Sequence, residues 1–194
     1  MKLSLLLSLI IFLNIGKICA LSITSIEGKK DRRDFEFSKT MIVRGIELKN
    51  GFLKMPLDGY KKKKYSNIKI LSKEFYHKIL NCFNGETCES SAEKKDILIK
   101  VEKIFSLKSP LRVANANISF DEELVVVFGI VKEKEVRGRK QEAKSQRSQT
   151  KTTDTDKIWI AYPKDFEIID GGFKDNLEKL IKKEFKETLK SEEK

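Results

Sequence analysis

Residues 124–131 read Leu-Val-Val-Val-Phe-Gly-Ile-Val, the most apolar run of the chain beyond its first 20 residues. An unbroken apolar run of this length favours a strand that is covered on both faces and lies inside a sheet. Such a strand needs partner strands at its edges and a further layer over its faces. The neighbouring sequence offers candidates for both.

Two flanking segments have the composition of partner strands. Residues 111–120 precede the run across Asp121-Glu122-Glu123, which we expect to form the turn of a hairpin. Residues 158–162 follow the run and carry Trp159, the only tryptophan of the chain. Because short turns join antiparallel strands, the sheet is predicted to be antiparallel.

Strand character extends into the N-terminal third of the chain. Apolar residues at or near every second position run from Phe35 to Leu57, and a further strand is expected at 66–71. Asn50-Gly51 interrupts the first of these segments. Asn-Gly between alternating apolar residues predicts a hairpin, because a type I′ turn needs positive φ at both central residues.

Two segments change to a helical period and enclose a pair of cysteines. Ser72 is the expected cap of a helix whose shared face comprises Phe75, Tyr76, Ile79, Leu80 and Phe83. A capping box at 90–93 opens an expected second helix that contains Ile97, Leu98, Val101, Ile104 and Phe105. Cys82 and Cys88 lie between them and are predicted to form a disulfide that staples a helical hairpin. The alternative is a metal site, but zinc needs further ligands and His77 is the only histidine.

The chain ends in an expected amphipathic helix. Asp170-Gly171-Gly172 breaks the preceding strand, and Asp175 with Glu178 is the expected capping pair. We expect the helix to pack on the sheet; the alternative places it on an anionic membrane surface. The predicted fold class is therefore α+β, an antiparallel sheet covered by the disulfide-stapled helical hairpin and the C-terminal helix. The apolar stripe of that helix comprises Phe173, Leu177, Leu180, Ile181, Phe185 and Leu189.

Residues 1–20 have the parts of a secretory signal peptide: Lys2, an apolar core from Leu3 to Leu13, and a short region that ends at Ala20. The core is shorter than the roughly 20 residues of a membrane-spanning helix, so no transmembrane span is expected in the mature chain. Cleavage after Ala20 predicts an exported protein of the periplasm, the cell envelope or the secreted fraction. The alternatives are an uncleaved signal and lipidation at Cys19, which the bulky and charged residues before it disfavour.

The remaining sequence predicts one domain with two irregular segments. Residues 21–34 are polar and lack periodicity, and we expect a flexible lead-in. Residues 35–194 are long enough for a single α+β domain. Residues 132–157 hold one large apolar residue, Val136, among many Lys, Arg, Gln, Ser and Thr, which predicts a mobile basic loop.

The chain is basic, with a formal charge of +11 that falls to +9 when Lys2 and Lys17 leave with the signal. In an exported protein, concentrated cations favour an anionic partner: an acidic polymer, an anionic lipid surface or an acidic protein. A solvated surface without a ligand is the alternative, and no specific nucleic acid is expected in that compartment. The predicted anion-binding residues form two groups, Lys61, Lys62, Lys63 and Lys64, and Arg137, Arg139, Lys140, Lys144, Arg147 and Lys151.

The sequence assigns no catalytic residue, metal site or cofactor. His77 lies in an expected helix, and the chain has no Gly-x-Ser-x-Gly elbow of a serine hydrolase. Carboxylate pairs occur at Glu122/Glu123 and Asp154/Asp156, but glycosidase chemistry needs two carboxylates that face each other across a cleft. Asp154-Thr-Asp156 also lacks the glycine and final glutamate of a calcium loop. Asn117-Ile118-Ser119 is a formal glycosylation sequon.

Three hypotheses for function follow from these observations. The first is a non-enzymatic envelope or secreted protein that binds an anionic partner through its basic segments. The second is a periplasmic structural or accessory protein that makes protein contacts. The third is a hydrolase whose carboxylates converge only in the folded chain.

Overall fold

The computed structural model describes residues 21–60, 62–86, 88, 96–132 and 158–192. Over these ranges the chain is α+β, with two helices, two five-stranded sheets and a separate two-stranded hairpin. Every strand pair within them is antiparallel. The predicted α+β class and the antiparallel pairing are confirmed.

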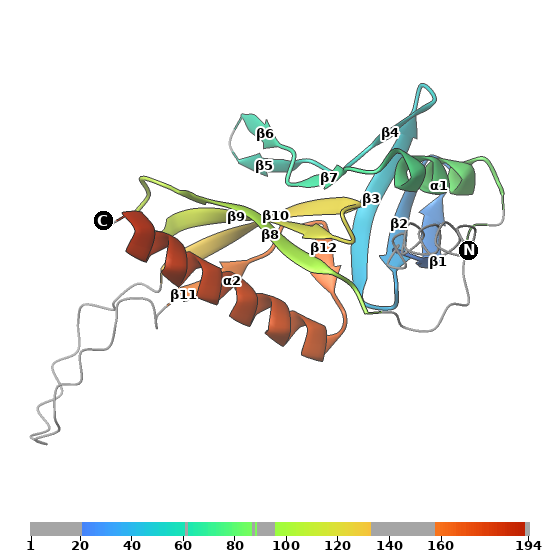
Figure 1. The fold of residues 1–194 in the computed structure, drawn as a ribbon. Helices are drawn as coiled ribbons and strands as arrows, with labels where there is room; N and C mark the ends of the chain where they lie inside the picture. The colour runs from blue at the N-terminus through green and yellow to red at the C-terminus, as the bar shows by residue number, and fades with distance from the viewer. Residues whose placement is uncertain (1–20, 61, 87, 89–95, 133–157, 193–194) are drawn as a thin grey trace, which may run out of the picture.

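Sheet A has the strand order β1-β2-β3-β12, and β4 also pairs with β3. Sheet C has the order β11-β10-β9-β8, and β7 also pairs with β10. Figure 1 shows the two sheets next to each other, with α1 against sheet A and α2 along sheet C. The strands of sheet A are β1 (Ile23–Lys29), β2 (Arg32–Phe37), β3 (Met41–Lys49), β4 (Phe52–Lys54) and β12 (Phe166–Ile168). Those of sheet C are β7 (Ile68–Ile70), β8 (Ile99–Ser106), β9 (Arg112–Phe120), β10 (Leu124–Lys132) and β11 (Ile158–Ala161). The hairpin consists of β5 (Asp58–Tyr60) and β6 (Lys63–Tyr65), and the helices are α1 (Lys73–Phe83) and α2 (Gly171–Glu192).

The apolar run at 124–131 forms β10, and its predicted position inside a sheet is confirmed. Its predicted cover on both faces is found only in part, because Val127 and Val131 on the outer face are partly exposed. β9 pairs with one edge of β10, and β7 and β11 share the other edge. Leu124, Val126, Phe128 and Ile130 point into the core, and Val125 on the opposite face is also buried. The turn before β10 contains Asp121 and Glu122, both with positive φ.

The predicted Asn-Gly hairpin is confirmed between β3 and β4. Asn50 and Gly51 have φ values of 53° and 78°, and Leu48 pairs with Leu53 across the turn. Positive φ at two successive residues matches the right-handed twist of the flanking strands.

One apolar core joins the two sheets and both helices. On sheet A, Phe35 and Phe37 pack against Phe83 and Phe75 of α1, with ring centroids 5.7 and 5.2 Å apart. The N-cap predicted for α1 is confirmed, because Ser72 Oγ accepts a hydrogen bond from the Phe75 amide at 3.1 Å. The two sheets thus share one interior and leave their opposite faces outward.

The core continues from β12 through sheet C to α2. Phe166 of β12 lies 6.0 Å from Phe120 and 5.8 Å from Phe128 between ring centroids. Leu177, Ile181 and Phe185 of α2 are buried in the same cluster. Residues from the C-terminal helix therefore cover the inner face of sheet C.

The second expected helix is wrong over Ile99–Ser106, where the chain forms β8. A β-bulge shifts the register between Val101 and Lys103, so Val101 pairs with Ile118 and Ile104 with Ala116. Because the bulge adds one residue, Val101 and Ile104 both point to the inner face although they are three positions apart. A separation of three is also the spacing of residues on one face of a helix, which explains the wrong prediction. Residues 89–95, where that helix was predicted to begin, lie outside the described residues. The predicted disulfide is present, with Cys82 and Cys88 Cα atoms 5.4 Å apart, and it joins the last turn of α1 to the segment that follows.

The N-terminal segment and the start of α2 also differ from expectation. Residues 23–29, predicted as part of a flexible lead-in, form β1, and Leu21 and Ile23 are fully buried. β1 pairs with β2 through backbone hydrogen bonds, and such bonds form without an apolar periodicity in the sequence.

The helix α2 begins at Gly171, one residue after Asp170, whose Oδ1 accepts from the Phe173 amide at 3.0 Å. Asp170 therefore caps α2 in place of the predicted pair at Asp175 and Glu178.

Candidate functional site

The predicted lysine run lies in the β5–β6 hairpin. Lys62, Lys63 and Lys64 are exposed there, beside the exposed ring of Tyr65. Lys61 and the second predicted group, Arg137 to Lys151, lie outside the described residues. The described residues on either side of that second group, Lys132 and Ile158, pair with each other in sheet C.

The base of this hairpin is attached to the outer face of sheet C, the face opposite the core. Ile68 is buried, so its neighbours Asn67 and Lys69 point to the outer face. The Asn67 amide donates to the Asp58 carboxylate at the start of β5. In Figure 1 the hairpin and α2 accordingly lie on opposite sides of sheet C. The exposed hairpin lysines therefore belong to the same side of the molecule as the outer face of sheet C.

Strand registers assign a set of cations and rings to this outer face. Ile104 of β8 packs on the core, so Lys103 and Phe105 on either side of it point outward. In β11, Ile158 and Ile160 are buried, so Trp159 also points outward and is 52% exposed. We call this surface the cationic face; it comprises Lys69, Lys100, Lys103, Arg112, Phe105 and Trp159, with the hairpin lysines beside it.

Arg112 lies flat on the cationic face over a glycine. It pairs with Val131, which in turn pairs with Trp159, so the three residues form one row across the sheet. Arg112 Nε donates to Asn115 Oδ1 at 2.7 Å. A Cβ on Gly129 would come within 2.8 Å of that same Nε, so the glycine makes room for the guanidinium. The cation is held in place and remains only partly buried.

The two rings of the cationic face lie several strands apart. Phe105 is 40% exposed, and Lys103 Nζ sits 4.5 Å from its ring centroid. Trp159 is three strands away and two residues further along, which corresponds to roughly 16 Å at usual strand spacing and rise. The rings are therefore far enough apart to contact separate units of an extended ligand.

One carboxylate, Glu102, lies among these cations. Ser119 Oγ donates to Glu102 Oε1 at 2.7 Å, and Lys100 Nζ is 3.2 Å from the same oxygen. The hydrogen bond from Ser119, followed by that from Lys100, lowers the pKa of Glu102 below its usual value. Glu102 occupies the β-bulge of β8, so a single extra residue brings this negative charge onto the face.

Sequence reasoning did not assign the cationic face. Lys100, Arg112 and Trp159 are single residues in three different strands, and only the pairing of those strands brings them together. The usable signal was alternation: the exposed Lys103 and Phe105 flank Ile104, which packs on the core, and the buried Ile158 and Ile160 flank the exposed Trp159. Such alternation identifies an outer face only once the segment is recognised as a strand.

The outer face of sheet A differs because its guanidinium groups, Arg32 and Arg44, are paired with carboxylates. Glu36, Ile42 and Glu167 form one row across β2, β3 and β12. Arg44 contacts Glu167 at 2.5 Å and lies 4.0 Å from Asp34. A shallow hollow of about 70 Å³ is lined here by Ser25, Glu27, Asp34, Glu36, Ile42 and Arg44. Carboxylates outnumber the one guanidinium among these residues.

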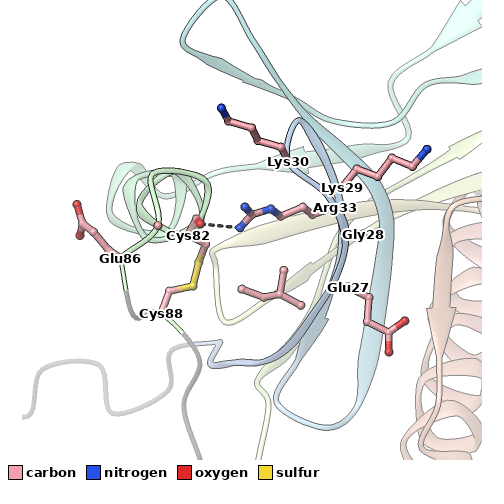
Figure 2. A pocket seen from close by; sticks show the side chains of 10 residues that line it. Glu27, Gly28, Lys29, Lys30, Arg33, Cys82, Glu86 and Cys88 are labelled. Atoms are coloured by element: carbon pink, nitrogen blue, oxygen red, sulfur yellow. Dashed lines mark hydrogen bonds between the residues drawn. A yellow bond between two sulfur atoms is a disulfide. The ribbon is translucent and has the colours of Figure 1, made fainter.

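The larger hollow, of about 370 Å³, lies between the β1–β2 hairpin and the end of α1. Figure 2 shows Arg33 at its centre, where Nη1 donates to the Cys82 carbonyl oxygen at 2.6 Å. The guanidinium also lies 5.0 Å from the Phe83 ring centroid. Glu27 and Glu86 point to opposite sides, and Lys29 and Lys30 point away from the hollow (Figure 2). Arg33 thus satisfies the C-terminal end of α1, and the hollow does not bring two carboxylates together.

The other candidate groups are placed as follows. His77 is exposed on α1, with its ring 5.8 Å from that of Tyr76. Glu122 and Glu123 occupy the β9–β10 turn, and the pair at Asp154 and Asp156 lies outside the described residues. Within the described ranges, no three His, Cys, Asp or Glu side chains are grouped to hold a metal ion. No helix among those residues is long and apolar enough to cross a membrane.

No protein-family model, no curated protein and no solved structure matches this chain. We therefore infer its function from the chemistry of its own surfaces.

Proposed function

We propose that this is an exported, non-enzymatic envelope or secreted protein that binds an acidic polysaccharide through the cationic face. The observation that supports the proposal is the combination of fixed cations and exposed rings on one sheet face, which no described helix covers. Lys100, Lys103 and Arg112 supply positive charge, and Phe105 and Trp159, on the strands β8 and β11 at either end of the row, supply apolar ring surfaces. The predicted signal peptide and the net charge of the mature chain are consistent with an anionic partner outside the cytosol.

The arrangement suits a chain of sugars better than the other anionic partners. Sugar rings have apolar C–H faces that pack on aromatic rings, and their sulfate, phosphate or carboxylate groups pair with Lys and Arg. Rings spaced across a flat sheet match an extended polymer. Insertion into a lipid surface instead favours apolar side chains on one continuous helical stripe or a protruding tip.

The first experiment compares two variants of equal net charge on immobilised heparin. Lys100→Gln, Lys103→Gln and Arg112→Gln remove three cations from the cationic face. At about 1 kcal/mol per cation near an anionic surface, the triple variant should bind roughly 100-fold more weakly. Retention of the wild type should also fall with salt, because screening shortens from about 10 Å at 0.1 M to about 3 Å at 1 M.

The matched control removes three exposed lysines from α2, on the opposite side of sheet C: Lys179→Gln, Lys183→Gln and Lys190→Gln. This variant should elute close to the wild type. Equal elution of both triple variants would show that only net charge matters, and equal elution of all three proteins would refute the cationic face as a binding site.

The second experiment tests the rings. Because Trp159 is the only tryptophan, its fluorescence reports this face alone. Heparin should change that fluorescence, and Trp159→Leu should weaken heparin binding while leaving binding to polyphosphate, a polyanion without rings, unchanged. Preference for anionic vesicles, single-stranded DNA or polyphosphate over heparin would replace the polysaccharide with that other class of partner.

A second candidate function is protein binding at the end of sheet C. Leu107 and Leu111, in the connection between β8 and β9, are exposed near Phe105. The Leu111 carbonyl oxygen accepts from the Lys132 amide, which places this loop beside the end of β10. Binding that survives 1 M salt and is lost in Leu107→Ser with Leu111→Ser would favour this accessory role.

A further inference from the structure

Leu21, which was predicted to lie in a flexible lead-in, is buried and hydrogen-bonded on both sides. Leu21 is fully buried, and its backbone nitrogen donates to Glu123 Oε2 at 2.7 Å. Its carbonyl oxygen accepts from Lys78 Nζ, also at 2.7 Å. Both polar groups of one backbone residue are therefore bonded to charged side chains from distant parts of the sequence.

The next residue is fixed in the same way. Ser22 is buried and exchanges backbone and hydroxyl contacts with Ser38: its amide donates to Ser38 Oγ at 3.1 Å, and its carbonyl accepts from the Ser38 amide at 2.8 Å. Leu21 and Ser22 thus connect three elements, namely α1 through Lys78, the β2–β3 turn through Ser38, and the β9–β10 turn through Glu123.

This position coincides with the predicted end of the signal peptide. Hydrolysis of the Ala20–Leu21 bond adds the hydroxyl of water to the Ala20 carbonyl and leaves an amine on Leu21. At neutral pH that amine takes up a proton and becomes an α-ammonium group. The atom that carries the new charge is the same nitrogen that already points at the Glu123 carboxylate.

We propose that cleavage by a signal peptidase creates an internal ion pair between the α-ammonium group of Leu21 and Glu123, and that this pair completes the fold of the mature protein. The bond from the Leu21 amide to the Glu123 carboxylate already has one ionised partner, and an α-ammonium donor adds a second charge of opposite sign and a direct Coulomb attraction. Glu123 is thus a binding site for the new N-terminus, and cleavage adds to stability by changing an amide donor into a cation.

The same geometry sets the order of events. Because Leu21 is completely buried in the folded protein, its side of the scissile bond is inaccessible to a protease. Cleavage therefore precedes folding, and the new amine enters its site as β1 pairs with β2.

The test compares mature chains that begin at Leu21 with chains that begin at Ala20, prepared by a protease that leaves no extra residue. The Leu21 form should melt about 4 °C higher, as expected for one charge-assisted contact in a domain of this size. Glu123→Gln should abolish that difference, whereas Glu122→Gln, the matched change in the same turn, should preserve it. Equal melting temperatures of the two forms, or a difference that survives Glu123→Gln, would overturn the proposal.

A second measurement needs no substitution. In the folded Leu21 form the α-amine should resist an amine-reactive ester at neutral pH and should react after denaturation. Rapid labelling of the α-amine in the folded protein would show that it is free in solvent and would contradict the ion pair. Sequencing of the native protein should find Leu21 first; a start at an acylated Cys19 would also refute it.

Discussion

The outer faces of the two sheets differ in how their guanidinium groups are paired, although their inner faces share one core. On sheet A, Glu36 and Glu167 flank Ile42. The guanidinium groups of this face are paired with carboxylates, Arg44 with Glu167 and Arg32 with Glu47. On sheet C, Arg112 is held by a neutral amide, and the lysines and the two exposed rings lie on the same face of the sheet. A guanidinium beside a carboxylate has its charge neutralised, whereas one beside an amide keeps its charge for a ligand.

The comparison separates what holds the fold together from what the surface can bind. Both sheets bury Phe residues against the same interior, so neither can be lost without the other. Their outer faces are exposed and are independent of each other in charge. Substitutions inside should therefore affect the whole molecule, and substitutions outside should affect one face.

The largest expected effect comes from the shared core. Phe35→Ala in sheet A and Phe128→Ala in sheet C should each lower the free energy of unfolding by about 3–5 kcal/mol, because each removes a fully buried ring and leaves a cavity. Urea unfolding followed by circular dichroism should show one transition in both variants. Phe52→Ala, at an exposed ring, is the control and should change stability by less than about 0.5 kcal/mol. Separate transitions for the two substitutions would mean that the sheets are independent units.

The disulfide should distinguish the two regions, because it lies at the end of α1 beside sheet A. Replacing Cys82 and Cys88 by serine should cost about 2.4 kcal/mol, the chain-entropy value for a loop of this length. Heparin retention should remain, since the disulfide joins the end of α1 to the segment that follows it, whereas the cationic face lies on sheet C. Thermal unfolding and the column test measure the two effects in one preparation. Loss of binding with an intact fold would give the cysteine pair a functional role.

The sequence predicted those features whose cause is local. The apolar run of β10, the Asn50-Gly51 turn and the Ser72 cap each depend on a few adjacent residues, and each is present. β8 was misread because its bulge gives apolar residues a helical spacing, which only the register with β9 explains.

The surfaces were harder to predict because they depend on pairing between distant segments. Lysine runs are visible in a sequence, and they drew attention to Lys61–Lys64, of which the described residues Lys62, Lys63 and Lys64 lie beside the cationic face. Arg112 and Trp159 are 47 positions apart in the sequence, and they lie in one row of the sheet only because both of their strands pair with β10. The buried contacts of Leu21 were likewise hidden, since Glu123 belongs to a turn that looks solvated in the sequence.

A smaller effect should come from one guanidinium group on each outer face, Arg112 on sheet C and Arg44 on sheet A. Arg112→Gln should weaken heparin binding about fivefold, the factor that corresponds to roughly 1 kcal/mol for one cation near an anionic surface. Arg44→Gln should leave binding close to the wild type, because Arg44 already contacts carboxylates. Its cost in stability should be at most about 1 kcal/mol, as for other exposed ion pairs. Titration of both variants with heparin checks the contrast, and an equal loss of affinity would mean that the two faces do not differ in function.

The smallest effect concerns Glu102, the carboxylate of the cationic face. Hydrogen bonds from Ser119 and then from Lys100 favour its charged form and lower its pKa in the folded state. This contribution to stability is therefore present above the pKa of the unfolded chain and is lost as the pH falls through the lower, folded value. Ser119→Ala should move the pKa of Glu102 back toward its ordinary value, which a carboxyl-carbon NMR titration measures directly. Glu102→Gln should slightly strengthen heparin binding by removing a negative charge from the face, while Glu36→Gln on sheet A should not. If the pKa of Glu102 is the same with and without the Ser119 hydroxyl, the hydrogen bond does not control this charge, and the effect of Glu102 on binding must come from its proximity to Lys100 alone.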